Sequence, residues 1–239
     1  MTGLVPLELN PELGTAQLGE RFRGDGRVRI ERMFTRGAPE LYHYLEANED
    51  WIQLVNHETG AHEMAWQDWC RPGSPHRSDL EPGMFARANE GFQYSYAALR
   101  IPAVDETEDN PVLTALADLM RAGPMQALLE GVTGLVAPTF TDGQVTAYGE
   151  GDFLTGHDDD LAGSGRKVAF VLGLTPRWRL EWGGLLLFHE LGAVTCAGLV
   201  PQFNTLDLFA IPRYHSVSMV TRAAPRRRFS VTGWLSIAD

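Results

Sequence analysis

Short apolar or alternating segments recur from about residue 143 onward, and each is bounded by Gly, Pro, Asp or Asn. Segments of this length with turn residues between them are typical of β-strands. A series of short strands without helices between them predicts a barrel or jelly roll and argues against strand–helix–strand units. The eight expected strands cover residues 143–149, 152–158, 167–174, 184–189, 193–199, 205–211, 214–220 and 227–236.

The first hundred residues have a weaker and more mixed pattern. Residues 27–31 alternate apolar and charged side chains, as a half-buried strand does, and residues 91–97 are also strand-like. A proline followed by apolar residues at helical spacing predicts a helix over about 38–48. Residues 1–25 read as a loose lead-in with one short helix, and residues 60–90 have no clear period.

The clearest helix of the sequence begins after Asn110. Asn is a good helix N-cap, and Pro111 suits the first helical position. A glycine–proline pair ends this helix, and a second helix is expected over about 125–129. The apolar face of the first helix consists of Val112, Leu113, Leu116, Leu119 and Met120.

These elements predict a mainly β protein with flanking helices. We expect one domain over residues 1–239, in which residues 1–142 form a helical and strand-containing buttress. Residues 143–236 are expected to form the core, a double-stranded β-helix of the jelly-roll or cupin-like kind. At 239 residues, a β-rich chain is not too long for a single domain.

Composition narrows the class of partner and compartment. A formal net charge of -11 disfavours binding to nucleic acid, which needs clustered cations. The two cysteines, Cys70 and Cys196, cannot form a disulfide framework, which favours a reducing compartment. The N-terminal residues lack the pattern of a signal peptide, and no apolar run is long enough for a membrane span. A cytoplasmic protein without a membrane partner is therefore expected.

Two histidines and a carboxylate stand in an order that predicts a metal site. His157 and Asp159 are two positions apart on an expected strand, so both side chains should lie on one face. His215 opens a distant strand that can fold back opposite them. Two imidazoles and one carboxylate form the facial triad of a non-haem Fe(II) site, which leaves metal positions open for other molecules. Taken alone, Asp159 could belong to a solvated acidic turn and His215 could be an ordinary buried histidine.

Arg228 extends this prediction from a metal site to a site that also binds an acidic ligand. Alternation along the last strand places Arg228, Ser230, Thr232 and Trp234 on one face, as a polar cavity lining. A dicarboxylic keto acid that chelates Fe(II) leaves its far carboxylate inside the barrel, where the planar fork of arginine binds it best. Three other arginines compete with Arg228 for this role, and a solvated basic edge is the alternative explanation for the run. They are Arg222, Arg226 and Arg227.

Four ordered motifs carry a resemblance to a known family. They are Tyr148–Asp159, with the sequence YGEGDFLTGHDD, then Trp182–Phe188, His215–Val217 and Arg228–Trp234. In these motifs, residues 143–236 resemble the 2-oxoglutarate and Fe(II)-dependent dioxygenases of the prolyl 4-hydroxylase superfamily. They are most similar to the branch that includes the oxygen-sensing and ribosomal-protein prolyl hydroxylases.

The resemblance implies roles for individual residues. His157, Asp159 and His215 would be the iron ligands and Arg228 would bind the C5 carboxylate of 2-oxoglutarate. Tyr148 would hydrogen-bond the co-substrate, and Thr232 would be a polar cavity residue. The implied cofactors and co-substrates are Fe(II), 2-oxoglutarate and O2, with ascorbate as a supporting reductant. One departure is that residues 167–174 lack the tyrosine with which relatives often assist the arginine.

The resemblance also implies the activity, which is hydroxylation of a prolyl residue in a protein or peptide. A free amino acid or another small molecule is the alternative substrate. Two other classes stay open, namely a non-catalytic sensor of 2-oxoglutarate or metal and a zinc hydrolase, although the latter would leave Arg228 unexplained. Aromatic residues before the barrel could line a peptide groove or belong to the core, and they are Trp66, Trp69, Phe85, Phe92, Tyr94 and Tyr96.

Overall fold

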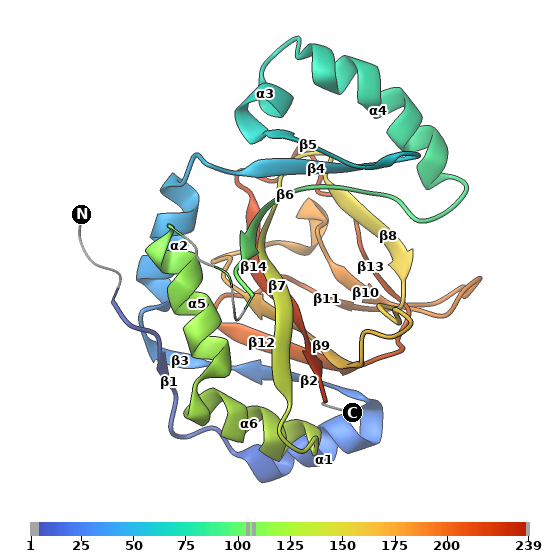
Figure 1. Cartoon of the computed structure of the whole chain (residues 1–239). Helices are drawn as coiled ribbons and strands as arrows, with labels where there is room; N and C mark the ends of the chain where they lie inside the picture. The colour runs from blue at the N-terminus through green and yellow to red at the C-terminus, as the bar shows by residue number, and fades with distance from the viewer. Residues whose placement is uncertain (1–4, 104–105, 107–108, 238–239) are drawn as a thin grey trace.

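The computed structural model describes residues 5–103, 106 and 109–237. Its N-terminal part alternates helices with strands (Figure 1). In chain order the elements are β1 (Glu8–Leu9), α1 (Thr15–Asp25), β2 (Arg27–Glu31), β3 (Phe34–Arg36), α2 (Ala38–Ala47), β4 (Ile52–His57), β5 (Gly60–Ala65), α3 (Trp66–Cys70), α4 (Pro75–Ala88), β6 (Tyr94–Ile101), α5 (Pro111–Arg121) and α6 (Gly123–Thr133).

All eight strands expected after residue 143 are present. They are β7 (Thr139–Tyr148), β8 (Phe153–His157), β9 (Arg166–Gly173), β10 (Leu186–Phe188), β11 (Ala197–Leu199), β12 (Thr205–Ala210), β13 (His215–Val217) and β14 (Arg228–Ser236), with a 3-10 turn at Leu180–Trp182. Strands β10, β11 and β13 are shorter than expected, with three residues each.

The strands form two antiparallel walls that curl toward each other, which confirms the jelly-roll prediction. One wall has the order β7–β14–β9–β12 and the other has the order β8–β13–β10–β11. Strand β6 pairs with both β7 and β8 and so joins the walls, while β2 continues the first wall beyond β12. The hairpin β4–β5 adds to β6 on a third side. Strands from the N-terminal half are therefore part of the same sheet.

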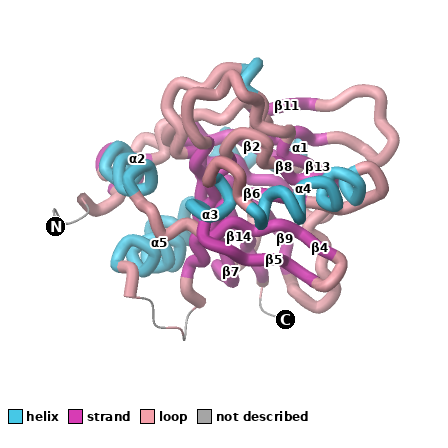
Figure 2. Tube along the Cα trace, turned by 90° about the horizontal axis from the view of Figure 1, so that it is seen from above, coloured by secondary structure: helices cyan, strands magenta, loops and turns pink. Residues whose placement is uncertain are grey.

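Helices α1, α2, α5 and α6 cover the outer face of the first wall (Figure 1), and α2 and α5 lie to one side of the strands in Figure 2. The apolar faces of these helices pack together with every second residue of β14 in one core, because each of these faces is turned toward the space between the helices and the wall. This core includes Phe22, Leu41, Leu116, Leu129, Phe229 and Val231. The buttress thus holds β14 from behind and leaves its other face free to line a cavity.

The expected N-terminal elements agree with the structure in most places. The strand over residues 27–31 and the helix over about 38–48 are β2 and α2, and the Asn110 side chain accepts a hydrogen bond from the Val112 amide. Helix α6 is longer than expected and ends at Gly134, which adopts the left-handed conformation that favours glycine. Residues 60–90 contain β5, α3 and α4, which the sequence pattern missed. Helix α4 is largely exposed and buries only Met84, so it has little apolar periodicity.

None of the helices in the described residues is long and apolar enough to cross a membrane.

Candidate metal centre and adjoining cavity

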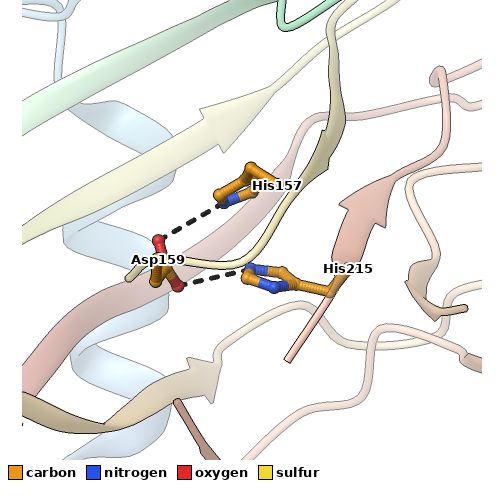
Figure 3. Close-up of side chains that lie close together, drawn as sticks. All are labelled: His157, Asp159 and His215. Carbon is orange, nitrogen blue, oxygen red and sulfur yellow. Dashed lines mark ion pairs between the residues drawn. The ribbon is translucent and has the colours of Figure 1, made fainter. Parts of the chain in front are cut away.

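The side chains of His157, Asp159 and His215 lie close together (Figure 3). His157 ends β8 and His215 begins β13, and the two are direct cross-strand partners. The Asp159 carboxylate lies between them, with Oδ1 3.4 Å from His157 Nε2 and Oδ2 3.4 Å from His215 Nε2. One potential ligand atom from each residue lies within 4.8 Å of the others. The three residues are thus grouped as a single small ion would require.

Asp159 reaches this group from a turn and not from a strand. Strand alternation was expected to align it with His157, but β8 ends at His157 and Asp159 has a left-handed φ of 62°. That conformation is uncommon outside glycine, although Asp and Asn adopt it more readily than most residues. The expected strand position of Asp159 was therefore wrong, while its expected closeness to His157 and His215 was right.

Backbone carbonyls orient both imidazoles. His157 Nδ1 lies 3.1 Å from the Thr155 carbonyl oxygen, and His215 Nδ1 lies 2.9 Å from the Arg213 carbonyl oxygen. Each Nδ1–H can donate to its carbonyl, which turns Nε2 toward Asp159 as a potential metal ligand. Metal-binding histidines are commonly oriented in this way.

Burial sets the charge of the group. It lowers the pKa of His215 to about 4, and the nearby His157 acts in the same direction, so His215 is neutral at neutral pH. Burial alone would raise the pKa of Asp159, but His157, His215 and the Trp234 indole outweigh it and lower that pKa. A neutral imidazole and an ionised carboxylate are the forms that bind a metal.

A cavity of about 200 Å³ opens beside the three residues and runs into the barrel. Arg228, Ser230, Thr232 and Trp234 all line it, which confirms the predicted alternation of β14. Arg228 is only 4% exposed, and its guanidinium lies over the Tyr148 ring, 5.2 Å from the centroid. Its Nη1 is buried and has no hydrogen-bond partner among the described residues. A buried cation with a free donor can bind an anionic group inside this cavity.

The competing arginines lie elsewhere. Arg227 points to the opposite face of β14, where it stacks on Trp51 and Trp66. Arg226 is exposed, and Arg222 forms a surface ion pair with Glu150. Of the four arginines considered from the sequence, Arg228 alone lines the cavity.

Tyr148 and Thr232 both line the cavity, as expected. Tyr148 is buried, and burial raises the pKa of its phenol well above the usual value, so the hydroxyl keeps its proton. The aromatic residues before the barrel divide between the two expected locations. Trp69 is buried in a small cluster with Met84 and Phe153, and Trp66 packs against the main core. Phe85 is half exposed and stacks on Phe153. The members that line the cavity are Phe92, Tyr94 and Tyr96.

Beside Tyr148, sequence reasoning left Tyr96 open between the core and a groove, and it missed the cavity residue Gln144. Tyr96 stacks on Tyr148 with ring centroids 5.1 Å apart, and Gln144 donates a hydrogen bond of 3.0 Å to the Tyr96 hydroxyl. Alternation on β6 and β7 could have placed each on an inner face. Strand β9 contributes no tyrosine but lines the cavity with apolar residues such as Phe170 and Val171.

The turn between β7 and β8 is held by a buried carboxyl group. Asp152 accepts hydrogen bonds from Gln53 Nε2 at 3.0 Å, Ser95 Oγ at 2.9 Å and the Gly149 amide at 2.8 Å. Burial raises the pKa of Asp152 to about 6 despite these donors. Asp152 therefore ties β4 and β6 to the turn whose two strands carry Tyr148 and His157.

Comparison with known proteins identifies the class. Residues 143–236 match the model of the 2OG-Fe(II) oxygenase superfamily. This part of the chain is a 2OG-Fe(II) oxygenase domain, and its wall order and strand directions are those of a double-stranded β-helix.

Two curated relatives are prolyl 3-hydroxylases named OGFOD1. The protein from Mus musculus is 31% identical over 131 residues, which are 52% of this chain and 23% of that protein. The protein from Xenopus laevis is 34% identical over 113 residues, which are 44% of this chain and 22% of that protein. The matched region thus spans less than a quarter of the length of either relative.

Solved structures share the fold at low sequence identity. A 2OG-Fe(II) oxygenase family oxidoreductase from Burkholderia pseudomallei has a TM-score of 0.65 at 15% identity, covering 98% of this chain and 96% of that one. A prolyl hydroxylase from Trichoplax adhaerens, solved in complex with a hypoxia inducible factor peptide fragment, has a TM-score of 0.60 at 15% identity and covers 93% and 88%.

Proposed function

We propose that this protein is an Fe(II)- and 2-oxoglutarate-dependent dioxygenase that hydroxylates a prolyl residue in a protein or peptide. The observation that carries the proposal is the common cavity shared by the triad and Arg228. The cavity is lined by three potential metal ligands and by a buried guanidinium whose Nη1 has no hydrogen-bond partner in the described part of the chain.

The donor set suits Fe(II). Two imidazole nitrogens and one carboxylate oxygen match the preference of Fe(II) for mixed nitrogen and oxygen ligands, and three protein ligands leave positions open. His157, Asp159 and His215 would hold the ion. When bound, Fe(II) would activate O2 as the oxidant, with 2-oxoglutarate as the reducing co-substrate: one oxygen atom would convert a substrate C–H bond to C–OH, and the other would enter succinate as 2-oxoglutarate loses CO2.

The other cavity residues position and shield the reactants. Arg228 would bind the far carboxylate of 2-oxoglutarate through two parallel N–H donors. Tyr148 and Thr232 add hydroxyl groups on the same wall of the cavity. Leu186 and Val217 form part of an apolar lining, which excludes water and strengthens the interaction between the guanidinium and the carboxylate.

Two features of the cavity favour a polypeptide substrate over a free amino acid. Among the described lining residues, Arg228 is the one cation and Asp159 the one carboxylate, and both have roles already. A free amino acid would need a further charged pair for its own termini. The cavity also continues into a groove of about 1010 Å³, which shares Tyr94, Tyr96 and Trp234 with it and gives room for flanking residues.

Proline in particular is favoured by the aromatic rim and by the relatives. The proline ring is stiff, apolar and without a backbone N–H, so aromatic surfaces suit it. The relatives named prolyl hydroxylases include one crystallised with a peptide. Acidic side chains at Asp50 and Glu63 line the groove and favour a basic flanking segment. A cytoplasmic location and a supporting role for ascorbate stay predictions.

The proposal is tested with purified protein, Fe(II), 2-oxoglutarate and O2. We expect succinate release that rises when a cell extract is added, together with the mass of one oxygen atom on a proline-containing peptide in tandem mass spectrometry. The His215→Ala variant is the control for adventitious iron chemistry. Efficient hydroxylation of free L-proline, without oxygen incorporation into peptides or extract proteins, would favour the small-molecule alternative. Binding of 2-oxoglutarate without any succinate would favour a sensor.

A further inference from the structure

Trp234 occupies a special position on the last strand. It is the final member of the inward-facing row of β14 and lines the cavity, and its direct partner on β7 is Asp142. The pairing with β7 shifts register immediately after Trp234, so that Leu235 lies opposite Phe140. Such irregularities bend a strand and redirect the side chain beside them, and they are frequent next to active sites.

The indole N–H of Trp234 is buried without a hydrogen-bond partner of good geometry among the described residues. Buried indole N–H groups normally donate to an acceptor. Asp159 lines the same cavity as Trp234 and carries the one carboxylate among the described lining residues. Asp159 is thus the natural acceptor for the indole N–H.

The indole ring is held from outside the cavity. The Arg166 guanidinium lies over the ring, 3.7 Å from its centroid, and Arg166 Nη2 forms an ion pair of 2.6 Å with Asp142. The Arg166 side chain is only 16% exposed, so the stack is largely shielded from solvent. Asp142 therefore supports Arg166, and Arg166 fixes the plane of the Trp234 ring.

We propose that Trp234 is a positioning residue whose indole N–H donates to one oxygen of the Asp159 carboxylate and keeps that oxygen off the metal. This inference rests on the proposed metal site. Asp159 lies on a turn with a left-handed backbone, so no strand pairing fixes the rotation of its carboxylate. A carboxylate that rotates freely can bind a metal through both oxygens and occupy a position that co-substrate or O2 needs. A donor to the second oxygen favours binding through one oxygen only.

Trp234→Phe tests the inference because it keeps an aromatic ring beneath Arg166 and removes only the N–H and part of the ring. Co(II) is a suitable probe, since its visible absorption changes with coordination number. We expect the variant to bind Co(II) roughly 10-fold more weakly, as is typical when the partner of a ligand is lost. We also expect its visible spectrum to differ from that of the wild type. Trp66→Phe, on the opposite face of the sheet, is the matched control and should change neither.

The results of the Co(II) experiment test the role of Trp234 separately from the proposed metal site. If the wild-type protein bound Co(II) no better than His215→Ala, the proposed metal site would fail. If the wild type bound Co(II) through the triad and Trp234→Phe had the same affinity and spectrum, the role of Trp234 would be refuted while the site would stand. Should Trp234→Phe not fold, Arg166→Gln decides, since loosening the ring should shift the spectrum in the same direction. An unchanged spectrum would overturn the inference.

Discussion

The guanidinium of Arg228 is the feature whose removal has the most calculable effect on the proposed activity. It is 4% exposed and lies over the Tyr148 ring at the inner part of the cavity. In Arg228→Ala the far carboxylate of 2-oxoglutarate would enter the same space without a cation. Removing one partner of a buried ion pair costs roughly 3–5 kcal/mol, which corresponds to a dissociation constant about 100- to 4,000-fold higher.

The structure favours the lower end of that range. The space left by the guanidinium adjoins the existing cavity of about 200 Å³, so water can enter and partly solvate the carboxylate. The hydroxyl groups of Tyr148 and Thr232 also remain. We therefore expect the affinity for 2-oxoglutarate to fall by about 100-fold in Arg228→Ala. Arg228→Lys keeps the charge but loses the two parallel donors, and we expect a loss of about 10-fold.

The assay is calorimetric titration of the metal-loaded protein with 2-oxoglutarate, with Mn(II) in place of Fe(II) to prevent oxidation. Arg226→Ala and Arg227→Ala are the controls, because Arg226 is exposed and Arg227 stacks on Trp51 and Trp66 away from the cavity. If Arg228→Ala bound 2-oxoglutarate as tightly as the wild type, the assignment of the co-substrate site would be refuted. A larger loss at Arg227 would mean that the inner face of β14 has been assigned wrongly.

Two further predictions concern the metal ligands and a buried acid. His157→Ala, Asp159→Ala and His215→Ala should each abolish Fe(II)-dependent succinate release without unfolding the protein, as measured by enzymatic assay and circular dichroism; wild-type activity in any of them would contradict the triad. Burial raises the pKa of Asp152 from 3.8 to about 6, so the stability that its protonated form contributes is complete below about pH 3.8 and is lost as the pH rises through about 6. The free energy of urea unfolding, relative to Asp152→Asn, should therefore fall by about 2 kcal/mol between pH 4 and pH 7.5, and a constant difference would show that Asp152 ionises normally.

Local pattern was enough to predict the barrel strands and the inner face of β14. Both depend on alternation, which a strand buried on one side imposes on its own sequence. The positions of Arg228 and Arg227 on opposite faces follow from this alternation alone. The grouping of His157 with His215 could also be predicted, because ligands for one ion must come from strands that meet.

The remaining features depend on contacts that local pattern does not encode. Tyr96 and Gln144 meet because β6 and β7 pair in one particular register, which is set by the packing of both walls. Asp159 lies beyond the end of β8 in a left-handed conformation, and the sequence of a short acidic segment does not specify that conformation. Helix α4 was missed because its exposed surface carries little apolar periodicity. The stack of Arg166 on Trp234 likewise joins strands distant in the sequence.

The position of β6 between the two walls has a consequence for the order in which the chain can fold during synthesis. β6 leaves the ribosome before β7 and β8, the strands of the two walls with which it pairs. Strand β2 remains unpaired for longer, because its partner β12 is made after β7 and β8. The apolar faces of α2 and α5 likewise share one core with β14, which is made after both helices. We therefore expect these nascent segments to expose unpaired strand edges and apolar surface until β14 has been made, a state in which chaperones would bind them.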